Sequence, residues 1–315
     1  SVLVIVVFFG IRKAGGCDAV MYNAMSLAGY LSMTQAHNMA DNTSSPYSLL
    51  TIFSTVAWGL GYFGMPHILL RFMAIGEEKK LVLSRRIATV WVVISMFVAI
   101  LIGIIGYGAS VAGVLPMFET SSESETIIIR LAGLLAEKNF LLALVAGVVL
   151  AGILACTMST ADSQLLTAAS SVSQNLLQDF LKIKMSPKQS MLAARLTVVG
   201  ISLIAVVLAW NPDSSVFYIV SFAWAGFGAA FGPVVLFSLF WRRTNFQGAL
   251  AGMLTGGVMV FVWKYLVKPM GGVWGIYELL PAFILGCIAI VVVSLATVAP
   301  SEEILKEFDS VKEEK

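Results

Sequence analysis

The chain has 315 residues, of which 58% are hydrophobic and only 12% charged, and its mean hydropathy is +0.89. This composition excludes an ordinary water-soluble domain and predicts a protein whose solvent is a lipid bilayer. The formal net charge of +2 is small, and the basic residues form short clusters between apolar runs, so no nucleic-acid-binding stripe is expected.

The chain begins with an apolar run at residues 1 to 10, which has no initiating Met and no basic flank. It therefore does not resemble a signal peptide, and we interpret it as the tail of a helix whose upstream part is missing. The three cysteines, Cys17, Cys156 and Cys287, are far apart, and no disulfide is expected.

Further apolar runs are long enough to cross a membrane, which takes about 20 mainly apolar residues. They are residues 48 to 70, 87 to 109, 140 to 164, 192 to 210, 216 to 241, 248 to 267 and 279 to 298. The predicted fold is an all-α membrane bundle of about seven full transmembrane helices plus a partial one.

Basic residues are unevenly distributed over the connections, which alternate between the two sides of the membrane. One side holds Arg71, Lys79, Lys80, Arg85, Arg86, Lys182, Lys184, Lys188, Arg195, Arg242 and Arg243. The other holds fewer, namely Arg12, Lys13, Arg130, Lys138, Lys264 and Lys268, together with an acidic stretch at 119 to 125. Because basic loops mark the cytoplasmic side, the connections 11 to 47 and 110 to 139 are predicted to be external and the tail internal.

The first full span contains three glycines and a proline between Trp58 and Pro66, which predicts a broken helix. Breaks of this kind free backbone carbonyls and amides, and secondary transporters use them as binding sites. Trp58 and Tyr62 are four residues apart and offer a stacking wall with a polar tip for a small ring-shaped solute. The alternative is a glycine-lined packing seam filled by aromatic side chains.

The third full span carries Ser159, Thr160, Asp162 and Ser163 within about a turn and a half. Such a density of oxygen atoms suits a weak, reversible cation site. Alternatively, the hydroxyls donate to carbonyls one turn earlier, and Asp162 lies at the cytoplasmic water line beside a loop Lys or Arg.

Several other segments are assigned mainly structural roles. Residues 221 to 233 and the glycines at 248, 252 and 256 predict close helix packing, although a gating role for the first stretch stays open. Residues 126 to 136 are predicted to be an external interfacial helix or lid, or equally a plain connection. The chain has no nucleotide loop, metal cluster or nucleophile with a base, so an enzyme is not expected.

At these positions the sequence resembles the sodium/solute symporter family, and within it the bacterial sodium/proline symporters, over essentially its whole length. The resemblance is carried by Trp58-Gly-Leu-Gly-Tyr-Phe-Gly-Met-Pro-His-Ile-Leu69, Met158-Ser-Thr160, Ser163-Gln-Leu-Leu166, residues 223 to 237, and Gly248-Ala-Leu-Ala-Gly-Met253. It implies a thirteen-span protein built on a LeuT-type inverted repeat of five plus five helices.

By that implication, residues 1–298 are a fragment of the transmembrane domain and 299–315 a cytoplasmic tail. Residues 48–241 would form the second inverted repeat and 248–298 two extra C-terminal helices. The first repeat, with half of the sodium site, would lie upstream, so this chain alone is not expected to transport.

The resemblance also implies roles for individual residues. Trp58, Tyr62 and Pro66 match positions implicated in proline binding. Ser159 and Thr160 match hydroxyl ligands of sodium, and Cys156 matches a position that supplies a backbone carbonyl.

The sequence differs at three positions from the pattern of the enteric bacterial proline symporters. Met65 replaces a glutamine, which bears on the choice of solute, and Cys156 replaces an alanine. Asp162 replaces a serine near a place where some relatives bind a second cation, for which Asp162 and Ser163 are the candidate ligands here.

These observations predict a secondary active transporter that imports L-proline with sodium by alternating access. We expect it in the plasma (inner) membrane, within the lipid bilayer, with a cytoplasmic C-terminus and no protein or nucleic-acid partner. The alternatives are the same transporter with another amino acid or a carboxylate as solute, and a solute sensor built on the same membrane fold.

Overall fold

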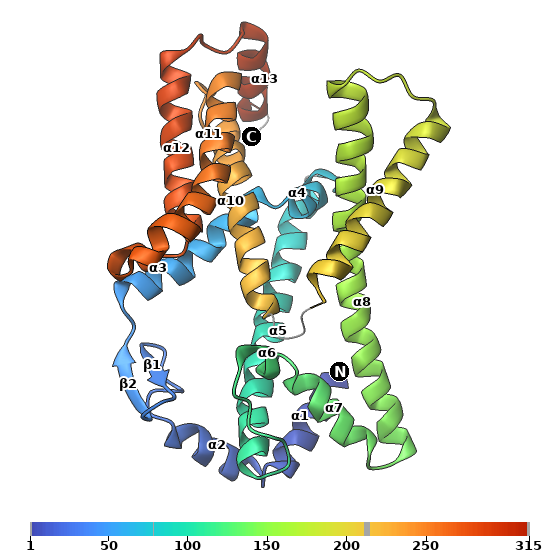
Figure 1. Cartoon of the computed structure of the whole chain (residues 1–315), viewed down its shortest axis with the longest axis vertical. Helices are drawn as coiled ribbons and strands as arrows, with labels where there is room; N and C mark the ends of the chain where they lie inside the picture. The colour runs from blue at the N-terminus through green and yellow to red at the C-terminus, as the bar shows by residue number, and fades with distance from the viewer. Residues whose placement is uncertain (1, 78, 211–214, 314–315) are drawn as a thin grey trace. The chain divides into compact units, whose positions relative to one another are not determined.

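The computed structural model describes residues 2–77, 79–210 and 215–313 (Figure 1). The α-helices are α1 (Val2–Lys13), α2 (Cys17–Ser26), α3 (Leu49–Ala57), α4 (Pro66–Met73), α5 (Lys79–Val111), α6 (Ser121–Ser124), α7 (Ile127–Ala136), α8 (Phe140–Ser170), α9 (Pro187–Leu208), α10 (Val216–Phe240), α11 (Phe246–Val262), α12 (Leu279–Ala296) and α13 (Glu302–Glu313). Two strands, β1 (Gln35–Asn38) and β2 (Thr43–Pro46), form a small hairpin.

Within the described residues, six helices are long and apolar enough to cross a membrane, and the bent pair α3–α4 brings the number to seven. Each of the seven predicted spans corresponds to one of these elements, which confirms the prediction of an all-α membrane fold. The LeuT-type repeat and the domain boundaries assigned from it stay predictions.

Three helix ends differ from the apolar runs that predicted them. α5 begins at Lys79 rather than near 87, and α8 runs on to Ser170 and into a π-helical turn, Ser171–Phe180. α9 begins at Pro187, where Ser186 and Gln189 form a capping box. Polar residues continue these helices beyond the apolar runs. The backbone hydrogen bonds of a helix do not depend on apolar side chains, so the helix need not end where the apolar run ends.

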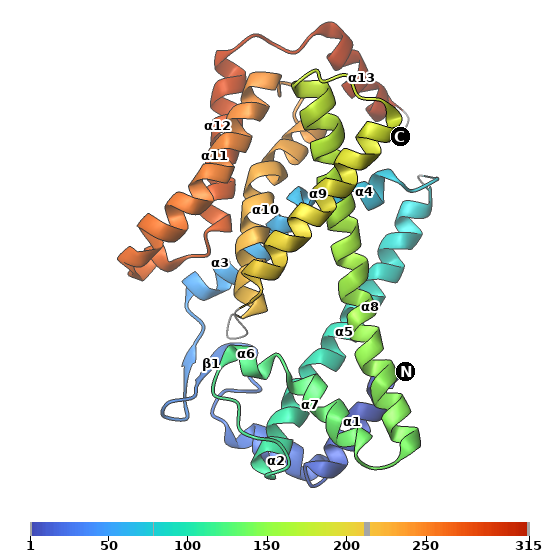
Figure 2. The same ribbon diagram turned by 45° about the vertical axis from the view of Figure 1, so that its right-hand side comes forward.

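The chain forms two compact units, each described by itself: residues 1–46 with 75–216, and residues 47–74 with 217–315. In the first unit, buried residues of α1, α2, α5, α7 and α8 form one apolar core. α7 contributes Leu131, Ala132 and Leu135 to this core, so the stretch predicted as an interfacial helix, lid or connection is a packed helix. Figure 2 shows α8 leading into α9 through the 171–186 connection.

The β1–β2 hairpin is one of the elements of the first unit that the sequence did not predict, together with the helices α2 and α6. Gln35 pairs with Pro46 and Asn38 with Thr43, and Asn42 takes a left-handed conformation (φ 51°) in the turn between them. Asn42 tolerates this backbone better than most residues do, and its side-chain amide donates to the Ser26 carbonyl (3.2 Å).

In the second unit, α11 and α12 lie side by side (Figures 1 and 2) because glycines remove the side chains between them. A β-carbon at Gly248 or Gly252 would collide with Ser294 or Ile290 of α12, and one at Gly256 would collide with the Ala229 carbonyl of α10. The predicted packing role of these glycines is confirmed.

Within the second unit, polar contacts tie the C-terminal helix α13 to the end of α10. Arg242 makes a bidentate contact with Asp309, at 3.1 and 2.7 Å, and the neighbouring Arg243 donates to the Thr297 carbonyl (2.8 Å). Asn245 caps α11 and donates to the Val298 carbonyl, so the segment leading into the tail is anchored.

Candidate substrate and sodium site

The helix predicted to break does so between Trp58 and Pro66. α3 starts at a Ser48 cap and ends at Ala57, residues Trp58–Gly64 form a 3₁₀ turn, and α4 then leaves at a bend of 54°. Met65 is extended, and Pro66 occupies the first turn of α4, where its missing N–H costs nothing.

Two glycines of the turn are required by close approach rather than by backbone angles. A β-carbon at Gly61 would overlap the indole of Trp224 in α10, and one at Gly64 would overlap the Phe227 carbonyl and Gly228. The break therefore presses directly onto α10, backbone against backbone at Gly64.

Five side chains form what we call the aromatic cluster: Trp58, Tyr62, Phe217, Trp224 and Tyr277. The Trp58 ring stacks on those of Phe217, Trp224 and Tyr277, with centroids 5.5, 5.7 and 6.0 Å away and planes within 17°. Tyr62 meets Trp224 edge-on, with ring centroids 4.8 Å apart, and the Tyr62 residue is 52% exposed. Trp224 thus lies against both Trp58 and Tyr62, and their role as a stacking wall for a solute stays a prediction.

Trp224 also makes a hydrogen bond to the backbone at the break. Its Nε1–H donates to the Trp58 carbonyl at 3.0 Å, at the point where α3 passes into the 3₁₀ turn. A carbonyl in an apolar setting is costly without a donor, so this bond stabilises the broken form of the helix.

Met65 and Pro66 adjoin the wall in different ways. Met65 is buried and its carbonyl accepts from the amides of Ile68 and Leu69, both at 3.0 Å. Pro66 is half-buried at the start of α4. Among the described residues no side chain caps the α4 N-terminus, which leaves its positive dipole end available to an anionic group.

The oxygen-rich stretch of α8 has a different character, because its bonds stay within the helix. Thr160 Oγ1 donates to the Cys156 carbonyl (3.2 Å), and Ser163 Oγ donates to the Ser159 carbonyl (2.9 Å). This is the back-bonding alternative for two of the hydroxyls, but it leaves hydroxyl lone pairs unused for a cation.

Asp162 is exposed on α8, and within the part of the chain that the structure describes it has no ion-pair partner. The pairing with a loop Lys or Arg that the water-line alternative would allow is thus not seen there.

The two predicted sets of residues belong to different compact units. Trp58, Tyr62 and Pro66 lie in the second unit, and Cys156, Ser159, Thr160, Asp162 and Ser163 lie in the first. Each set lies on one short stretch of its own unit, residues 58–66 and 156–163. A pocket shared by both sets stays a prediction.

Sequence reasoning did not single out three members of the aromatic cluster, Phe217, Trp224 and Tyr277. Phe217 lies inside a predicted span, where an apolar ring gives no signal of its own. Trp224 was grouped with a packing segment, although a tryptophan flanked by alanines in a glycine-rich helix was a signal for a ring inserted against a neighbour. Tyr277 gave no signal, because it stands in a short connection before α12 and contacts residues more than 50 positions away.

Comparison with known proteins defines the class. Residues 1–256 match the model of the sodium:solute symporter family, and the chain belongs to this family. That membership confirms the resemblance read from the sequence and agrees with the expectation that the chain is not an enzyme.

Individual relatives are bacterial proline transporters by name. The chain is 41% identical over 263 residues to the sodium/proline symporter of Haemophilus influenzae, covering 84% of this chain and 51% of that protein. It is 41% identical over 266 residues to the sodium/proline symporter of Escherichia coli, with 83% and 50% covered. The high-affinity proline transporter PutP of Bacillus subtilis is 39% identical over 266 residues, with 84% and 54% covered. The chain thus spans about half the length of the curated relatives it matches.

Proposed function

We propose that the protein of which this chain is part imports L-proline together with sodium by alternating access. Family membership and the names of the relatives support sodium coupling and proline as solute. The observation that carries the proposal is the break between Trp58 and Pro66, stabilised by Trp224 and walled by aromatic rings.

The chemistry of the break suits a zwitterion with an apolar ring. The last turn of α3 presents carbonyls and the first turn of α4 presents amides, so the two helix ends favour an ammonium and a carboxylate, respectively. The exposed face of Tyr62, beside the Trp58 stack, would cover the pyrrolidine ring.

Sodium, as the co-transported ion, would use oxygens of α8. The Cys156 carbonyl and the Ser159 and Thr160 hydroxyls are neutral ligands, which suits an ion that must be released in every cycle. Asp162 and Ser163 are the proposed ligands of a second cation. We place the protein in the plasma (inner) membrane with α13 on the cytoplasmic side, following the distribution of basic residues.

Uptake of labelled proline by the full-length protein in proteoliposomes tests the proposal. We expect uptake to require a sodium gradient and to be lost in Trp58→Ala and Thr160→Val. Trp91→Ala and Thr157→Val are matched controls: Trp91 is an exposed ring on α5, and Thr157 donates to the Ile153 carbonyl just as Thr160 does to Cys156. Proline uptake that proceeds equally without sodium would refute the coupling.

A further inference from the structure

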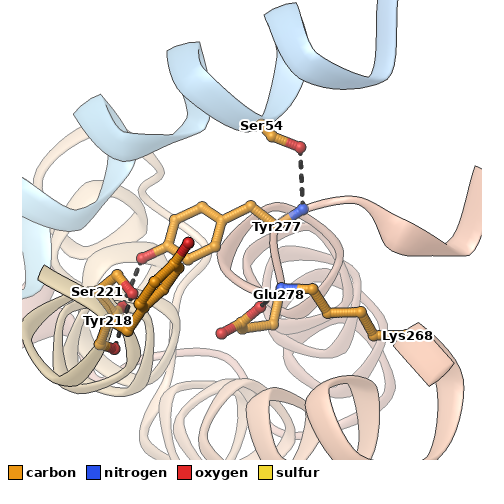
Figure 3. Close-up of polar contacts among 6 residues, drawn as sticks. All are labelled: Ser54, Tyr218, Ser221, Lys268, Tyr277 and Glu278. Carbon is orange, nitrogen blue, oxygen red and sulfur yellow. Dashed lines mark hydrogen bonds and ion pairs between the residues drawn. The ribbon is translucent and has the colours of Figure 1, made fainter. Parts of the chain in front are cut away.

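Tyr277 and Glu278, at the start of α12, lie beyond residues 1–256 that match the family model, and their polar contacts have no role in the function proposed so far. With their partners Ser54, Ser221 and Lys268 they form a polar group (Figure 3). We call it the α12 clamp.

Tyr277 contacts three parts of the second unit at once. Its backbone amide donates to Ser54 Oγ of α3 (3.0 Å), and its hydroxyl donates to the Ser221 carbonyl of α10 (2.6 Å), as Figure 3 shows. Between these two bonds its ring stacks on Trp58, 6.0 Å away. Tyr277 therefore connects α3, the first half of the broken helix, to α10, and its ring lies against Trp58 of the aromatic cluster.

Tyr277 is itself held in place by an ion pair. The Glu278 carboxylate, whose side chain is only 3% exposed, lies 2.8 Å from Lys268 Nζ, and the lysine side chain is 39% exposed. A carboxylate buried to this extent is costly without its partner, so the pair fixes the end of the α11–α12 connection. Tyr277 and Glu278 are adjacent in sequence and bind different partners. Together these contacts restrict the backbone at the start of α12.

The Tyr277 hydroxyl is also a dependable donor. Burial, with the nearby Glu278 carboxylate as a smaller cause, raises the pKa of the Tyr277 phenol well above its usual range. The phenol stays protonated at any pH at which transport would be measured.

We propose that Tyr277 is a positioning residue for the substrate wall: it holds α3 and the Trp58 ring against α10 without contacting the solute. This inference rests on the proposed function, because it takes Trp58 to be part of the binding site. A ring that is ordered before the solute arrives costs nothing to order on binding. Loosening the clamp should therefore weaken apparent affinity and leave the turnover rate largely intact.

The test compares Tyr277→Phe, which keeps the ring and removes the hydroxyl, with wild type in the full-length protein. KM and Vmax for proline are measured per amount of folded protein. Loss of one hydrogen bond predicts a rise in KM of about three- to tenfold with Vmax unchanged. Tyr265→Phe is the control, since Tyr265 is exposed and no hydrogen bond of its hydroxyl is found among the described residues.

A double-mutant cycle separates positioning from general stability. If Tyr277 acts through Trp58, the effects of Tyr277→Phe and Trp58→Phe on KM are not additive, whereas a purely structural role gives additive effects. An unchanged KM in Tyr277→Phe, a fall in Vmax alone, or additive effects would each overturn the proposal.

Hydrogen exchange tests the clamp without any solute. Tyr277→Ala, and separately Lys268→Met with Glu278→Gln, should speed amide exchange in residues 49 to 64, while Tyr265→Ala should not. Unchanged exchange in that segment would refute the clamp. Absence of sodium-dependent proline uptake by the wild type would instead refute the proposed function, so the two failures are distinguishable.

Discussion

The broken helix and the oxygen-rich stretch of α8 solve the same problem in opposite ways. At the break, the Trp58 carbonyl accepts a hydrogen bond from a partner 166 positions away, the indole of Trp224. On α8, Thr160 and Ser163 satisfy their hydroxyl protons four residues back in the same helix. The aromatic cluster at the break is therefore held by tertiary packing, whereas the Thr160 and Ser163 hydroxyls are held by their own helix.

The largest effect is expected when a side chain is added at Gly64, the glycine through which the broken helix contacts α10. Gly64→Ala would place a β-carbon on the Phe227 carbonyl, where no side chain can move aside. Overpacking costs about 1–3 kcal/mol, so we expect a lower melting temperature and loss of most proline uptake.

Gly59→Ala is the matched control for stability, because a β-carbon at Gly59 in the same turn meets nothing within 4 Å. Its melting temperature should stay at the wild-type value. If both variants melt alike, the close approach at Gly64 is not what holds the break.

A smaller change removes only the hydrogen bond from Trp224 to the Trp58 carbonyl. Trp224→Phe keeps an aromatic ring but loses the Nε1–H donor to Trp58. A hydrogen bond of about 1 kcal/mol predicts a rise in the KM for proline of about fivefold. Trp91→Phe, on an exposed face of α5, should leave KM unchanged, and an equal shift in both variants would contradict the assignment.

The smallest expected effect concerns α8 and tests whether Asp162 binds a cation. Asp162→Ser removes the one carboxylate of the oxygen-rich stretch. If it is a ligand of a second cation, the sodium concentration at half-maximal uptake should rise about threefold, because ligand charge tunes cation affinity. The sodium dependence of uptake checks this, with Asp162→Asn as the isosteric variant. An unchanged curve would return Asp162 to the water line.

Much of this architecture could be predicted from the sequence, because a bilayer imposes rules that act over single segments. Hydropathy located every span, and the glycines with Pro66 located the break, since each of these signals is local. The ends of α5 and α8 were wrong by several residues because polar side chains continue a helix into water.

What the sequence could not predict depends on partners far along the chain. Nothing local to Trp224 says that its indole fills the space left by Gly61, and nothing near Tyr277 says that it reaches Ser54 and Ser221. The short strands at 35–38 and 43–46 were missed for another reason: they are polar and lack the alternation that marks a strand.

The glycine seam of α10, α11 and α12 has a mechanical consequence. A β-carbon at Gly248, Gly252 or Gly256 would collide with α12 or α10, so the three helices pack closely at these positions, and we expect them to move together. α3 and α4, by contrast, are joined through a turn that lacks regular α-helical bonding and bends by 54°. We therefore expect any motion of this unit during transport to change the angle between α3 and α4 at residues 58–65, while α10, α11 and α12 keep their packing.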